Sequence, residues 1–128
     1  MTTQLAAIDL GSNSFHMIVA QVGERGRLTT VDRIKEPVRL AAGLDASGNI
    51  TAAAADRALS CLGQFAERLA GFPSAHVRAV GTNTLRRARN RMDFLELAQD
   101  TLGHRIDIIP GTEEARLIYA GAVSYTHL

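Results

Sequence analysis

The stretch AAIDLGSNSFHMIVA, residues 6–20, joins two apolar runs through the short polar loop Gly11–Ser14. The second run, Phe15–Val22, has apolar residues on both alternating faces, which is typical of a strand covered on both sides of its sheet. The first run, Leu5–Ile8, is expected to form the neighbouring strand. Asp9 ends that run, so its carboxylate should lie beside whatever the loop holds.

The composition is that of an ordinary soluble globular domain. The chain has 128 residues and a net charge of +1, with 46% hydrophobic and 21% charged residues. This near-neutral charge gives no reason to expect nucleic acid or an anionic membrane as the main partner. The single cysteine, Cys61, allows no internal disulfide and favours a reducing, cytoplasmic setting. No apolar run approaches the ~20 residues of a membrane span, and the N-terminus lacks a signal-peptide pattern.

Beyond the hairpin, the predicted elements alternate between strands and helices. Hairpins early in the chain and alternation later favour an α/β fold, with a mixed sheet of about five strands flanked by helices. The first of these is a strand over Leu28–Leu40, with Pro37 at a bend or edge, and it is followed by a helix that Thr51 caps and that Gly71 and Pro73 stop. Next come a strand over His76–Val80 and helical structure after Gly81, which is interrupted near Asn90 and continues as a second segment over Met92–Leu102. The last two elements are a strand over Arg105–Ile109 and a helix from Glu113 to about Ala122.

The loop Gly11–Ser14 has the composition of a phosphate-binding loop. Glycine and small residues let backbone N–H groups approach an anion closely, and the side chains of Ser12, Asn13 and Ser14 add further donors. Asp9 could hold a hydrated divalent cation beside the phosphate. The alternative is a hairpin turn with an acid at its edge, because short glycine motifs often match by accident.

Two further loops follow predicted strands and open predicted helices. GTNTLRRA, residues 81–88, offers free N–H groups to an anion, with Thr82 at the helix start and Arg86 as a bidentate clamp. Its alternative is an N-cap followed by a solvated basic face. GTEEARLIY, residues 111–119, contains Glu114, whose carboxylate could accept a proton from attacking water, although acids in a first turn also offset the helix dipole. We expect the three loops to gather at one end of the sheet.

Other reactive side chains have structural interpretations. The basic run RRARNR, residues 86–91, has no interleaved aromatic residues and therefore does not indicate a nucleic-acid site. The histidines at 16, 76 and 104 lack metal-ligand spacing with one another or with Cys61. Cys61 lies in a predicted amphipathic helix, where it is expected to be a small packing residue.

Five segments, in the right order, resemble the N-terminal part of the exopolyphosphatase and guanosine pentaphosphate phosphatase family. They are AAIDLGSNSFHMIVA, VRLAAGLD, CLGQFAERLAGFP, VRAVGTNTLRRARN and IIPGTEEARLIYAG. NSFHM together with TLRRARN is more similar to the exopolyphosphatase branch. The resemblance implies a ribonuclease-H-like lobe of the actin-like ATPase type, with the active-site cleft between two such lobes.

The resemblance also implies roles for individual residues. Asp9 and Gly11–Ser14 would form the first phosphate loop, Arg86 would contact the substrate phosphate, and Glu114 would be the general base. The implied activity is hydrolysis of the terminal phosphoanhydride of inorganic polyphosphate, with Mg²⁺ or another divalent cation as cofactor. The full-length protein is expected to be a homodimer.

The family has a second glycine-rich phosphate loop after the EEAR helix, and this chain ends before it. Residues 1–122 are therefore expected to be the first lobe of the catalytic module, inactive alone, and residues 123–128 are expected to be a non-native tail. Three alternatives stay open: a guanosine pentaphosphate phosphohydrolase, an ATP-binding kinase or ATPase of the same superfamily, and a non-catalytic phosphate-binding fragment. Glu114 after a short strand favours the phosphatases.

Overall fold

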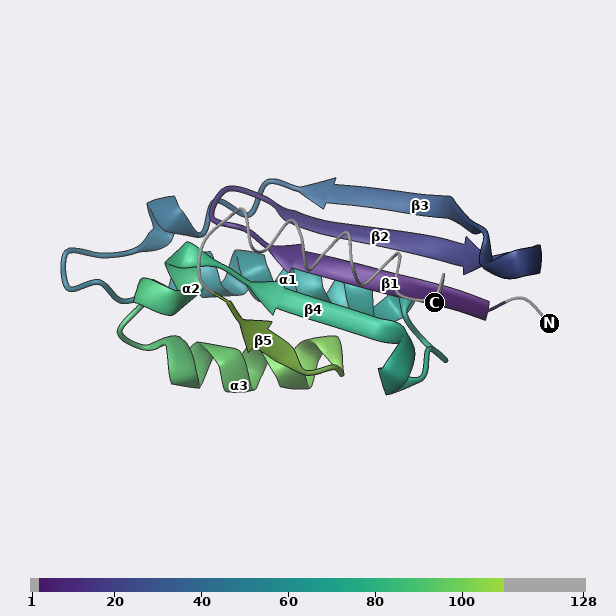
Figure 1. The fold of residues 1–128 in the computed structure, drawn as a ribbon. Helices are drawn as coiled ribbons and strands as arrows, with labels where there is room; N and C mark the ends of the chain where they lie inside the picture. The colour runs from purple at the N-terminus through teal and green to yellow at the C-terminus, as the bar shows by residue number, and fades with distance from the viewer. Residues whose placement is uncertain (1–2, 110–128) are drawn as a thin grey trace.

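The computed structural model describes residues 3–109, which form a five-stranded sheet with helices packed against one of its faces (Figure 1). The strand order is β3-β2-β1-β4-β5. The first three strands form an antiparallel meander, whereas β4 pairs parallel to β1 and β5 pairs parallel to β4. The predicted mixed sheet is confirmed. The strands are β1 (Thr3–Leu10), β2 (Phe15–Val22), β3 (Leu28–Glu36), β4 (Val77–Gly81) and β5 (Ile106–Ile108).

Strand bounds differ from the predictions where neighbours or proline decide them. β2 has the predicted bounds, while β1 is two residues longer at each end because it pairs with β2 on one side and β4 on the other. The prediction of one strand as far as Leu40 is wrong. β3 ends at Glu36, since Pro37 has no N–H to donate to a sheet.

The first helix, α1 (Ala52–Arg68), begins as predicted. The hydroxyl oxygen of Thr51 accepts the Ala54 N–H at 3.2 Å, so Thr51 is the N-cap. The buried side chains of α1 recur at helical spacing and face the sheet. They are Ala54, Ala58, Cys61, Leu62 and Phe65.

Two helices follow β4, with the predicted interruption between them. They are α2 (Asn83–Arg87) and α3 (Arg91–Leu102). Gly103, at φ +80°, closes α3 with its N–H on the carbonyl of Gln99, as expected of a C-terminal glycine. The strands before and after these two helices, β4 and β5, are shifted or shortened relative to their predictions. β4 starts after a 3-10 turn over Ser74–His76, and β5 has three residues.

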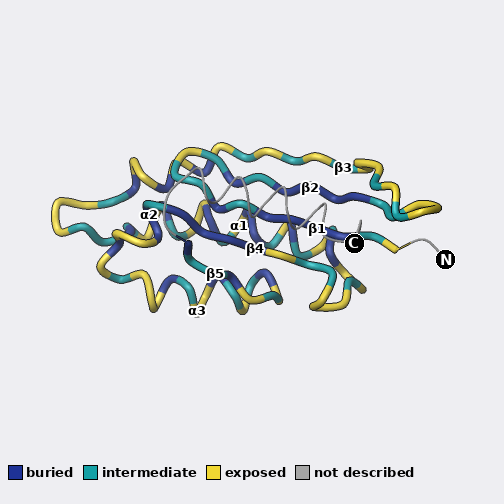
Figure 2. The backbone as a smooth tube through the Cα atoms, in the orientation of Figure 1, coloured by how far each residue is buried: buried dark blue, intermediate teal, exposed yellow. Residues whose placement is uncertain are grey.

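The core lies between the sheet and the two long helices, α1 and α3. Figure 2 shows β1, β2 and β4 largely buried, whereas the edge strand β3 is exposed along much of its length. The opposite face of the central strands is apolar and buried as well, at Leu5, Ala7, Ile18 and Val80. This agrees with the two-sided pattern of the sequence. Between residues 3 and 109, no helix has both the length and the hydropathy needed to cross a bilayer.

Candidate functional site

Two of the three predicted loops meet at one end of the sheet. Leu10 and Gly81 are paired at the ends of the parallel strands β1 and β4, so the loop Gly11–Ser14 and the start of α2 leave the sheet side by side (Figure 1). The N–H of Ile109 donates to the carbonyl of Gly81 at 2.9 Å, which brings the end of β5 to the same edge. Glu114, the predicted general base, and the helix expected around it lie outside the described residues.

The loop Gly11–Ser14 closes on itself in a way that requires glycine. The Gly11 N–H donates to the Ser14 carbonyl at 3.1 Å. A Cβ at position 11 would lie 2.8 Å from that carbonyl oxygen, closer than real Cβ contacts allow. Position 11 therefore requires glycine because the backbone approaches closely there, and not because of an unusual φ.

A second segment, residues 37–41, holds the loop from outside; we call this segment the strap. The Ala41 N–H donates to the Ser12 carbonyl at 2.9 Å, and the Arg39 N–H donates to the Asn13 carbonyl at 2.8 Å. Because a trans peptide points its C=O and the following N–H in opposite directions, the N–H groups of Asn13 and Ser14 face away from the strap.

Neither of these two N–H groups has an acceptor within residues 3–109. Two adjacent backbone donors directed to one side are the arrangement that binds anions in proteins. The hydrogen bonds of the strap thus support the phosphate interpretation of Gly11–Ser14 over that of a plain turn.

The strap is itself fixed by two buried side chains and by two hydrogen bonds from α1. Its apolar residues Val38 and Leu40 are buried, at 4% and 0% exposure, while Arg39 between them is exposed at φ +55°. Arg57 of α1 donates from Nε to the Val38 carbonyl at 3.1 Å and from Nη2 to the Arg39 carbonyl at 3.5 Å. Sequence reasoning missed the strap, because its function depends on backbone groups that carry no residue signature.

Two buried threonines at the start of α2 contact the loop and the end of β1. The hydroxyls of Thr84 and Ser12 are hydrogen-bonded at 2.7 Å, and Thr82 Oγ1 lies 3.5 Å from the Leu10 carbonyl. Thr82, predicted to bind phosphate, is 3% exposed, and its hydroxyl is turned toward the end of β1. Its role in phosphate binding stays a prediction.

Arg86, the predicted clamp, lies on the solvent side of α2. The residue is exposed and forms no ion pair within residues 3–109, so it is available to a ligand. The helix has only five residues, and its dipole therefore contributes little to anion binding. The strap-held loop, rather than this helix terminus, supplies the backbone donors.

Asp9, the predicted cation ligand, is half-buried on β1 one residue before Leu10. The register places it directly opposite His16 on β2 and beside Val80 on β4, so the three side chains share a sheet face. The position of His16 beside Asp9 could have been predicted from the sequence, because an antiparallel hairpin with the loop Gly11–Ser14 must pair residues 9 and 16.

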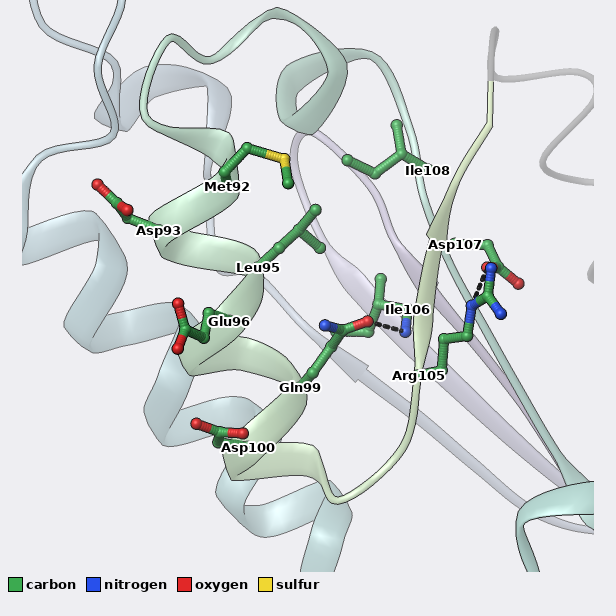
Figure 3. Close-up of a pocket in the computed structure, with 10 residues that line it drawn as sticks. All are labelled: Met92, Asp93, Leu95, Glu96, Gln99, Asp100, Arg105, Ile106, Asp107 and Ile108. Carbon is green, nitrogen blue, oxygen red and sulfur yellow. Dashed lines mark hydrogen bonds and ion pairs between the residues drawn. The ribbon is translucent and has the colours of Figure 1, made fainter.

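A pocket of about 610 Å³ lies between α3 and β5 but is separate from this site (Figure 3). The carboxylates of Asp93, Glu96 and Asp100 extend from the side of α3 turned away from β5 (Figure 3). Asp107, on the strand, is paired with Arg78 and Arg105. None of the residues lining this pocket belongs to the loop, the strap or α2.

Cys61 is a packing residue, as predicted. Its side chain is 5% exposed, and burial together with the nearby Glu36 carboxylate raises the pKa of the thiol to about 12. A thiol with this pKa stays protonated at neutral pH and does not act as a nucleophile.

The chain is similar to two curated proteins. A Haemophilus influenzae protein, named only as a candidate exopolyphosphatase, is 50% identical over 118 residues, which are 92% of this chain and 36% of that protein. The guanosine-5'-triphosphate,3'-diphosphate pyrophosphatase of Photobacterium profundum is 52% identical over 117 residues, 91% of this chain and 23% of that protein. This chain thus spans about a third or less of either relative's length.

A solved structure confirms the fold class. The exopolyphosphatase of Cytophaga hutchinsonii is 31% identical and superimposes with a TM-score of 0.80, covering 93% of this chain and 38% of that chain. The fold class is therefore the predicted ribonuclease-H-like lobe. Residues 18–128 match the model of the Ppx/GppA phosphatase family, and on that match the chain belongs to this family.

Proposed function

We propose that the full-length protein carrying this chain is an exopolyphosphatase, a hydrolase that removes the terminal phosphate of inorganic polyphosphate. The observation that supports this most is the pair of N–H groups, on Asn13 and Ser14, that the strap turns to one side of the loop. The names of the relatives from H. influenzae and C. hutchinsonii support the same substrate class.

In this proposal the first lobe binds and neutralises the terminal phosphate. The backbone of Gly11–Ser14 and the hydroxyls of Ser12 and Ser14 donate hydrogen bonds to its oxygens. Arg86 clamps two oxygens with its planar guanidinium, and Thr82, which directly precedes α2, lines the site. These donors stabilise the charge that spreads over the equatorial oxygens as the phosphoryl group transfers.

The residues present are compatible with a divalent cation, which we propose to be Mg²⁺. Residues 3–109 contain no group of three or more metal-binding side chains, so they form no all-protein cage. Mg²⁺ in phosphate sites needs only one or two carboxylates, because waters and phosphate oxygens complete its shell. Asp9, next to the loop, supplies one such carboxylate. When bound, the cation neutralises charge on the phosphoanhydride.

The proposed general base is Glu114. Its carboxylate accepts a proton from a water molecule as the water oxygen bonds to the terminal phosphorus. The bond from that phosphorus to the bridging oxygen breaks, and the electron pair leaves with the shortened polyphosphate. The products are orthophosphate and a chain one unit shorter.

A second candidate substrate is guanosine pentaphosphate, because the P. profundum relative is a guanosine-5'-triphosphate,3'-diphosphate pyrophosphatase. Steady-state phosphate release by the full-length protein from polyphosphate, guanosine pentaphosphate and ATP separates the candidates. A kcat/KM highest for polyphosphate is the expected result. Preference for ATP, or phosphate binding without any release, would overturn the proposal in favour of a kinase, an ATPase or a non-catalytic protein.

The proposal also includes a cytoplasmic location and a homodimeric full-length protein. The support for this location is that the sequence has a single cysteine, Cys61, which allows no internal disulfide. Sedimentation equilibrium of the full-length protein tests the dimer, and a mass of one chain at micromolar concentration would contradict it.

A further inference from the structure

The hydroxyls of Thr84 and Ser12 lie 2.7 Å apart, although the residues are 72 positions apart in the chain. Their hydrogen bond connects α2 directly to the loop Gly11–Ser14. Thr84 is 6% exposed, whereas Ser12 is half-buried at the open end of the sheet. The two hydroxyls therefore differ in burial, and this difference decides which of them donates the hydrogen bond.

One hydroxyl must donate the shared proton, and burial determines which one. Each hydroxyl has one hydrogen and two lone pairs. Within residues 3–109 the Thr84 hydroxyl has no acceptor other than Ser12 Oγ. If Ser12 were the donor, the Thr84 hydrogen would be buried without a partner, which is costly. Thr84 therefore donates and Ser12 accepts.

This direction leaves the hydrogen of Ser12 free for a ligand. With one lone pair of its Oγ occupied by Thr84, the Ser12 hydroxyl can rotate only so that its O–H is directed away from α2. A hydroxyl that accepts a hydrogen bond is also polarised into a better donor. A phosphate at the N–H groups of Asn13 and Ser14 would lie within reach of this third donor.

We propose that Thr84 is a positioning residue, which orients the Ser12 hydroxyl as a hydrogen-bond donor to the phosphate. This assignment rests on the proposed function, because it takes the ligand of the loop to be a phosphate. Thr84 itself contacts no ligand and acts through Ser12 alone. Its contribution must therefore disappear when the Ser12 hydroxyl is removed.

A double-mutant cycle in the full-length protein tests this dependence, with long-chain polyphosphate as substrate. Thr84→Val keeps the shape of the side chain but removes its donor, and we expect KM to rise about tenfold, the effect of one impaired charged hydrogen bond. Thr84→Ser restores the hydroxyl and should stay close to the wild type. In the Ser12→Ala background, Thr84→Val should add nothing further.

Thr101→Val is the matched control, because the Thr101 hydroxyl donates to the Leu97 carbonyl on the exposed side of α3, away from the loop. It should leave KM unchanged. Equal KM values for Thr84→Val and Thr101→Val, or an undiminished effect of Thr84→Val in the Ser12→Ala background, would overturn the positioning role alone. A wild-type protein that neither releases phosphate from polyphosphate nor binds tripolyphosphate would overturn both this assignment and the proposed function.

Discussion

Asn90 binds the backbone of Ile50 through both polar atoms of its carboxamide. Oδ1 accepts the Ile50 N–H at 2.8 Å, and Nδ2 donates to the Ile50 carbonyl at 3.1 Å. The pairing joins the junction of α2 and α3 to the residue that precedes the N-cap of α1.

We predict that Asn90→Ala lowers the free energy of unfolding by about 1–3 kcal/mol, because it leaves two partly buried backbone groups without partners. Asn90→Asp keeps the acceptor but loses the donor, so its free energy of unfolding should lie between those of Asn90→Ala and the wild type. Urea unfolding at pH 7 measures both. The control is Gln99→Ala, which removes a single hydrogen bond to the Ile106 N–H. A loss for Asn90→Ala no greater than for Gln99→Ala would contradict the prediction.

Gly11→Ala should weaken phosphate binding strongly, because the added Cβ would force the Ser14 carbonyl away and open the loop. The matched control is Gly63→Ala in α1, where the nearest atom to a new Cβ is Thr101 Cγ2 at 3.9 Å. That change should stabilise the fold by up to about 1 kcal/mol and leave binding intact. Titration with tripolyphosphate gives the affinities, and equal affinities for the two variants would argue against the loop as the phosphate site.

Arg57→Ala should loosen the strap without unfolding the protein. Loss of its hydrogen bonds to the Val38 and Arg39 carbonyls should speed hydrogen exchange at the Arg39 and Ala41 amides about two- to tenfold. Arg68→Ala is the control, since Arg68 lies on the same helix and forms a half-exposed ion pair with Asp32. Unchanged exchange at both amides in Arg57→Ala would show that the strap is held without Arg57.

In the full-length protein, Glu114→Gln should lower kcat by about 100- to 10,000-fold, the usual cost of losing a positioned general base. Polyphosphate affinity should stay the same or improve, because one negative charge leaves a site that binds a polyanion. If Glu114 merely offsets a helix dipole, hydrolysis will be nearly normal and only stability will fall slightly. Phosphate release and polyphosphate affinity, measured together, distinguish the two.

Arg86→Ala is the counterpart, and it should weaken polyphosphate binding as well as turnover. Arg87→Ala, on the same short helix and also exposed, is its control and should change neither by more than a small electrostatic amount. Equal effects of the two substitutions would mean that the helix contributes only general positive charge.

Stability should fall at alkaline pH because of Cys61. The pKa of its thiol is raised from 9.0 to about 12 in the folded protein, chiefly by burial. Below pH 9 the thiol is protonated in both states, and its contribution is fully present. Between pH 9 and 12 the unfolded chain loses this proton while the folded chain keeps it, so the free energy of unfolding declines as pH rises. Cys61→Ala should flatten that decline, and an unchanged slope would contradict the prediction.

Local sequence signals predicted the elements well, and contacts between distant residues were the part they could not supply. The bounds of β2, the N-cap at Thr51 and the glycine at Gly103 all depend on neighbours within a few positions. The end of β3 was missed because alternation continues past Pro37, into a strap whose apolar residues are buried outside the sheet.

The candidate site shows the same limit. Its glycine-rich loop and Arg86 are visible as motifs, but the strap and Thr84 contact that loop across 26 to 72 positions of the chain. Backbone hydrogen bonds such as that of Arg39 with Asn13 leave no trace in residue type. They appear only when the sheet has brought both segments together.

The parallel pairing of β1 with β4 has a consequence for synthesis of the chain on the ribosome. The meander β1–β2–β3 needs only the first 36 residues, but the partners of the loop in α2 are made after residue 80. Hairpins form from nearby segments, whereas the β1–β4 contact must close a long loop first. The nascent chain can therefore pair the meander and the strap with the loop first, whereas the hydrogen bond between Thr84 and Ser12 must wait until α2 has left the exit tunnel.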